Sequence, residues 1–98
     1  MPYIKSESRA MFEAVIATLP AMDSTGELNF VLTTICAKYI NDYGKITYNR
    51  INDVMGALSA VSAECYRRIA APYEDMKIKQ NGDINAFEQF GLDEVVDR

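Results

Sequence analysis

Two arginines and two tyrosines form the most suggestive chemical group in this sequence. Tyr66, Arg67 and Arg68 are consecutive, and Tyr73 follows two helical turns later. A guanidinium group can hold a phosphate or carboxylate through paired hydrogen bonds, and a tyrosine ring can stack on a base while its phenol donates a hydrogen bond. We therefore take these four residues as a candidate site for a small anionic ligand such as a nucleotide, with Arg67 and Arg68 on the phosphate.

The same residues also have a plainer interpretation. In this interpretation Tyr66 packs in the core, and the two arginines form surface ion pairs with acidic neighbours. These neighbours are Glu64, Glu74 and Asp75. Exposed ion pairs of this kind are common and contribute little to stability, so the spacing alone does not choose between the two interpretations.

Other kinds of chemistry have few residues to carry them. The chain contains no histidine, two cysteines without a CxxC spacing and no glycine-rich phosphate loop. We predict no catalytic residue, no metal ligand and no cofactor. A magnesium site made of Glu27, Asp53 and Glu64 is the weakest of our alternatives, because no ExxE pair puts two acids on one face. Helix capping by Glu27 and an i,i+4 pair between Glu64 and Arg68 explain two of these acids more simply.

The net charge of −4 is concentrated at one end of the chain. Residues 1–82 hold nine acidic and nine basic side chains, whereas residues 83–98 hold five acids and one arginine. Generic nucleic-acid binding is disfavoured, because it requires a clustered basic surface.

No apolar run reaches the length of a membrane span, and no signal peptide is recognisable, so we expect a cytoplasmic protein without a membrane partner. Cys36 and Cys65 are expected to be buried free thiols.

Three amphipathic helices must position the candidate site. Ser6 is expected to cap a first helix with Phe12, Val15, Ile16 and Leu19 on its inner face, and Ser24 to Glu27 read as a capping box for a second. The third begins after Thr47 and should end or kink before Pro72, with a further helix over 73–80 and a cap at Asn81-Gly82.

Short connections between these helices favour an antiparallel bundle. The predicted fold is all-α, with three main helices plus a short C-terminal one. Residues 1–82 form the helical domain, into which Tyr3 and Ile4 fold, and 83–98 an acidic segment that is either a short docking helix or partly disordered. Gly56, Ala60, Ala63 and Ala70 form a face of small residues along the third helix, which fits intramolecular packing or a subunit interface. Because this face leaves spare packing surface, we expect a homo-oligomer.

Several short blocks resemble a small family of uncharacterised proteins encoded by phages and prophages. The blocks are MPYI at the start, GELNF at 26–30, Tyr48-x-x-Ile51-Asn52, Gly56, YRR at 66–68, APYED-x-K at 71–77 and NGD at 81–83. Ser59 departs from the pattern, which often has a carboxylate there. The resemblance covers about residues 1–83 and implies a phage-type protein in the host cytoplasm, but it implies no established activity.

Three functional hypotheses follow from these observations. The first is a non-enzymatic protein that sequesters a small anionic ligand, a nucleotide or a host immune signal, at Arg67, Arg68, Tyr66 and Tyr73, in a pocket between subunits. The second is an adaptor or inhibitor that binds a host protein through its acidic segment or an exposed helix face. The third is a magnesium-dependent nucleotide hydrolase.

Overall fold

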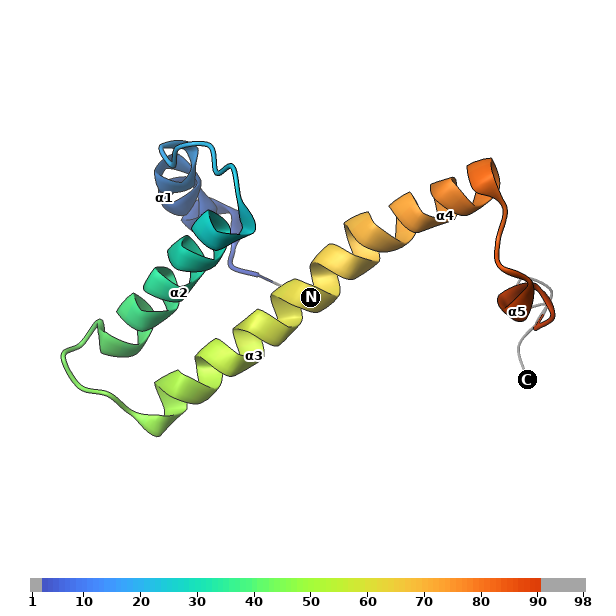
Figure 1. Ribbon diagram of the computed structural model, residues 1–98. Coiled ribbons are helices and arrows are strands. Elements are labelled where there is room, and N and C mark those ends of the chain that lie inside the picture. The colour runs from blue at the N-terminus through green and yellow to red at the C-terminus, as the bar shows by residue number, and fades with distance from the viewer. Residues whose placement is uncertain (1–2, 91–98) are drawn as a thin grey trace.

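The computed structural model describes residues 3–90 and shows an all-helical chain, as the sequence predicts (Figure 1). No strand occurs among these residues. The elements are three long helical stretches and a short C-terminal helix: α1 (Ser6–Ala17), α2 (Thr25–Asn41), α3 (Tyr48–Cys65), the π-helical segment η1 (Tyr66–Ala70), α4 (Ala71–Asn81) and α5 (Asn85–Glu88).

The starts of α2 and α3 are fixed by side-chain caps at the predicted positions. The Thr47 hydroxyl accepts a hydrogen bond from the Arg50 amide at 3.2 Å, and the Ser24 hydroxyl accepts one from the Glu27 amide at 3.1 Å. The Glu27 carboxylate accepts from the Asp23 amide at 2.6 Å, one residue earlier than in a standard capping box. These bonds satisfy amides that the first turn of a helix otherwise leaves without a partner.

The start of α1 differs from the prediction. Ser6 is already the first helical residue, and Lys5, with φ −58° and ψ 147°, takes the capping position without a side-chain bond. A serine in helical conformation cannot act as the cap, because capping requires the extended backbone that Lys5 adopts. The predicted cap at Asn81-Gly82 is confirmed, because Gly82 has a φ of 82°. Gly44, in the turn after α2, likewise has a φ of 72°, where a side chain would be strained.

A single rod of helix runs from Tyr48 to Asn81 (Figure 1). The predicted boundary before Pro72 is present, but the chain does not leave the helical path there. Instead α3 widens into η1, where the Ala71 amide donates to the Tyr66 carbonyl, five residues back. Pro72 then lies in the first turn of α4, where it has no amide to donate the next hydrogen bond of the rod.

Helices α2 and α3 pack as a hairpin, and Arg50 makes the contacts that join its two helices. Its Nε donates to the Tyr39 carbonyl at 2.6 Å, and its guanidinium lies 3.8 Å from the centre of the Tyr39 ring and 4.9 Å from that of Tyr43. The Tyr39 hydroxyl donates to Asp53 at 2.7 Å, and this bond raises the pKa of the tyrosine. One arginine thus joins the end of α2, the loop and the start of α3.

We expect Arg50→Ala to destabilise the hairpin by about 1–3 kcal/mol. The change removes a charge-assisted hydrogen bond to a carbonyl and two cation–π contacts. Chemical denaturation followed by circular dichroism measures the loss. Arg50→Lys is the matched control and should recover part of it, because lysine keeps the charge but not the planar fork. Equal stability of Arg50→Ala and the unmodified chain would contradict the assigned role.

The predicted inner faces of the helices are not buried within one chain. On α1, Phe12, Val15 and Ile16 are 53, 60 and 62% exposed, and no described residue is fully buried. Tyr3 and Ile4 also remain largely exposed. Periodicity identifies the face of a helix that prefers burial, but it does not say what covers that face. The three helices therefore follow the predicted order without enclosing a core of their own.

The two thiols and the C-terminal segment also bear on the predictions. Both cysteines are free, but Cys36 is half-buried and Cys65 is exposed, so their predicted burial is wrong for a single chain. Within the acidic segment, α5 is a helix of four residues, and the rings of Phe87 and Phe90 lie 6.3 Å apart. Residues 91–98 lie outside the described part of the chain, so disorder there stays a prediction.

Candidate anion-binding site

The Tyr-Arg-Arg sequence coincides with the π-helical segment η1. Tyr66, Arg67 and Arg68 begin the segment and Ala70 ends it. A π-turn changes the direction in which successive side chains leave the helix, and such turns are frequent at functional sites. The local cause is the proline two residues beyond, which cannot donate the next helical hydrogen bond. The sequence thus places its two adjacent guanidinium groups on the irregular turn of the long rod.

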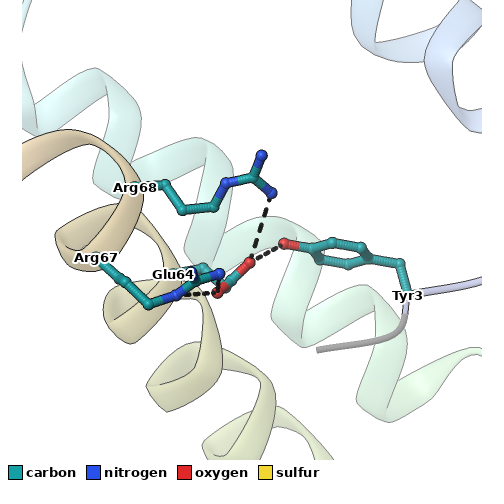
Figure 2. A network of polar contacts seen from close by, with 4 residues as sticks. All are labelled: Tyr3, Glu64, Arg67 and Arg68. Carbon is teal, nitrogen blue, oxygen red and sulfur yellow. Dashed lines mark hydrogen bonds and ion pairs between the residues drawn. The ribbon is translucent and has the colours of Figure 1, made fainter.

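Both guanidinium groups converge on one carboxylate, that of Glu64 (Figure 2). Arg67 donates from Nη2 at 2.8 Å and from Nε at 3.3 Å to the same oxygen, Oε1. Nη1 of Arg68 lies 3.9 Å from Oε2, an ion pair longer than a hydrogen bond. The Tyr3 hydroxyl donates to Oε2 at 2.9 Å, which ties the N-terminal segment to the end of α3. The cluster therefore has two positive groups around one negative group.

The contacts around Glu64 hold it in its charged form. The hydrogen bonds from Arg67 and from Tyr3 lower the pKa of the Glu64 carboxyl, and its side chain is only 16% exposed. The same contacts raise the pKa of the Tyr3 hydroxyl and that of the Arg67 guanidinium. Each shift favours the charge state that forms the cluster. At neutral pH the cluster of Glu64, Arg67 and Arg68 consequently carries a net charge of +1.

The arginines remain accessible although they are paired. The side chain of Arg67 is 68% exposed and that of Arg68 is 64% exposed. A guanidinium group has five N–H donors, and the oxygens of one carboxylate cannot engage all those of two arginines. This geometry fits the simpler sequence interpretation, surface ion pairing with Glu64, and it also leaves donors that an incoming anion can reach.

The two tyrosines of the predicted site face other partners. The Tyr66 hydroxyl donates to Glu74 at 3.0 Å, which raises the pKa of the tyrosine, and Nζ of Lys77 lies 5.6 Å from the centre of the Tyr73 ring. Both rings are more than half exposed, so the alternative in which Tyr66 packs in the core is wrong. The structure thus joins Arg67 to Arg68 through Glu64, and it links each tyrosine to a residue of α4.

Sequence reasoning found the arginines but missed the role of Tyr3. The pairs of Glu64 with Arg67 and Arg68 follow from spacings of three and four residues. The Tyr3 contact joins residues 61 positions apart, and no local pattern announces it. Among the residues that the structure describes, one hollow lies between α2 and α3 and another lies beside residues 20–31. Neither is lined by Arg67 or Arg68.

The three carboxylates of the hydrolase hypothesis have separate local roles. Glu27 binds the amide before α2, Asp53 accepts from Tyr39, and Glu64 binds the arginines. Within residues 3–90, no group of three or more acidic or cysteine side chains is placed to hold a metal ion. Magnesium is usually held by one or two carboxylates together with waters and substrate phosphates, and each of these three carboxylates already has a protein partner of its own.

These features define a small all-helical protein with an exposed arginine cluster on a π-turn. The chain belongs to the family described as a domain of unknown function, DUF6899, whose model matches residues 1–84. No curated protein and no solved structure matches the chain. Among the described helices, none combines the length and the apolar character that crossing a membrane requires.

Proposed function

We propose that this chain is a non-enzymatic binding protein of phage type that sequesters a small anionic ligand in the host cytoplasm. The observation that carries the proposal is the convergence of Arg67 and Arg68 on one carboxylate while both guanidinium groups stay mostly exposed. A phosphate that approaches this cluster meets a net positive charge and paired N–H donors already held close together. The ligand class is a nucleotide or a nucleotide-like immune signal of the host.

The tyrosines supply the second half of the recognition. Tyr66 and Tyr73 lie on η1 and α4, within two turns of the arginines, and expose more than half of their surfaces. An exposed ring offers a face on which a base can stack, and such stacking tolerates different bases. The alternative is an adaptor or inhibitor that binds a host protein through its acidic segment or an exposed helix face, such as that of α1. We prefer the arginine cluster because two converging, exposed guanidinium groups specify the chemistry of a ligand, whereas an exposed helix face does not.

Calorimetric titration with a panel of linear and cyclic nucleotides and inorganic pyrophosphate tests the proposal. For any ligand that binds, we expect Arg67→Ala/Arg68→Ala to weaken the affinity about tenfold to a hundredfold, because charge-assisted hydrogen bonds contribute about 1.5–3 kcal/mol. Lys38→Ala/Lys45→Ala is the matched control, since it removes the same charge from the hairpin end of the molecule. An equal loss in both variants, or no binding by any member of the panel, would overturn the proposal.

A further inference from the structure

A single chain has a much larger accessible surface than a compact protein of the same mass. The accessible surface is 8901 Å² for 11.0 kDa, whereas a compact monomer of this mass exposes about 5,600 Å². The radius of gyration is 19.0 Å, against about 13 Å for a compact domain of this length. About 3,300 Å² per chain is therefore surface that a folded protein of this size normally covers.

The most regular part of this surface is a groove along the α2–α3 hairpin. It has a volume of about 380 Å³ and is lined almost entirely by apolar side chains. The lining residues follow the same spacing on both helices, i, i+3, i+4 and i+7, and include Leu32, Ile35 and Cys36 on α2 and Val54, Leu58 and Val61 on α3. The polar exception, Asp53, accepts the Tyr39 hydroxyl at 2.7 Å. Two antiparallel helices with matched stripes form one layer of a four-helix bundle.

A second copy of the same hairpin is the occupant that fits this groove. An identical stripe has the same length and the same apolar character, and a two-fold axis pairs the surface with itself. The excess surface of about 3,300 Å² per chain is larger than the roughly 800 Å² per partner that a stable interface buries, and it falls in the range of obligate homodimers, which bury more. Within the chain, α5 cannot serve, because it lies at the far end of the rod (Figure 1).

We propose that the α2–α3 hairpin is half of a four-helix bundle, completed by the hairpin of a second copy of this chain. The bundle core then consists of the two groove linings, and the η1–α4 end of each rod extends beyond it. This inference does not rest on the anion site: assembly can hold without any ligand, and the ligand titration can fail while assembly holds.

Native mass spectrometry of Leu58→Glu tests the assembly. For the unmodified chain we expect an even number of copies, with the dimer as the smallest species. Leu58→Glu places a charge in the groove and should shift the mass to that of one chain. The control, Ser59→Glu, adds the same charge to the next residue of α3, outside the groove lining, and should leave the assembly intact. A monomeric or odd-numbered unmodified chain would overturn the proposal.

The Cys36 thiol gives a second measurement that does not depend on the folding of Leu58→Glu. In a Cys65→Ser background, Cys36 is the one remaining thiol and lines the groove. If a second hairpin covers it, alkylation of the native protein should be more than about tenfold slower than alkylation of the urea-unfolded chain, because only transient opening exposes it. If the alkylation rates of the native and the unfolded chain agree, the groove is open and the proposal is wrong.

Discussion

Dilution is expected to unfold this protein. No described residue is fully buried in a single chain, and even the most apolar faces of α1 remain more than half exposed. A lone helix of 12 residues is marginal in water, and hydrophobic burial is the main term that offsets the loss of conformational entropy. The separated chain buries little apolar surface, so folding and association should be a single event.

The expected result is a melting temperature that falls as the protein is diluted. For a dimer that unfolds as it dissociates, each tenfold dilution lowers the stability by about 1.4 kcal/mol. Circular dichroism at 222 nm over a dilution series measures this, together with a progressive loss of helix at the lowest concentrations.

A tandem fusion of two copies through a flexible linker is the matched control. It makes the association intramolecular, so its melting temperature should no longer depend on concentration. If the melting temperature of the unmodified chain stays constant across the series, the chain folds alone, and the link between its exposed faces and assembly fails.

The boundaries of the helices were predictable because local chemistry determines them. Thr47 and Ser24 accept amides of the first turn, Gly82 takes a positive φ, and Pro72 restricts the residue before it. Each signal acts within four residues, so it can be read from the sequence. Ser6 is the exception: it is an acceptable cap, but the neighbouring Lys5 adopts the extended backbone that a cap requires.

The burial of the helix faces and the contacts between distant residues were not predictable in the same way. The stripe of Phe12, Val15 and Ile16 shows which face of α1 avoids water, but its exposure in one chain could not be foreseen from periodicity. In the candidate site, too, contacts between near neighbours in the sequence could be predicted and the contact between distant residues could not. The pairing of Glu64 with Arg68 follows from i,i+4 spacing, whereas its bond to Tyr3 depends on where the N-terminal segment crosses α3.

Replacing Glu64 by glutamine is expected to strengthen anion binding about tenfold. The Glu64 carboxylate occupies guanidinium donors at 2.8 Å on Arg67 and lies 3.9 Å from Arg68, so it competes with any ligand phosphate and repels it. Its pKa is lowered by the bonds from Arg67 and Tyr3, so it stays charged at neutral pH. Glutamine has a similar shape and can still accept hydrogen bonds, but it raises the charge of the cluster from +1 to +2.

Titration of Glu64→Gln with the best ligand of the nucleotide panel measures this gain, which corresponds to about 1.4 kcal/mol. The control is Glu13→Gln, which makes the same change of charge on α1. Acidification should act on the unmodified chain in the same direction. Because the pKa of Glu64 is lowered, its carboxylate still competes as the pH falls through the usual carboxyl range, and the competition is lost only as the pH falls further, through that lowered pKa. A fall in affinity for Glu64→Gln would mean that the carboxylate orients the guanidinium groups, and the competition account would then be wrong.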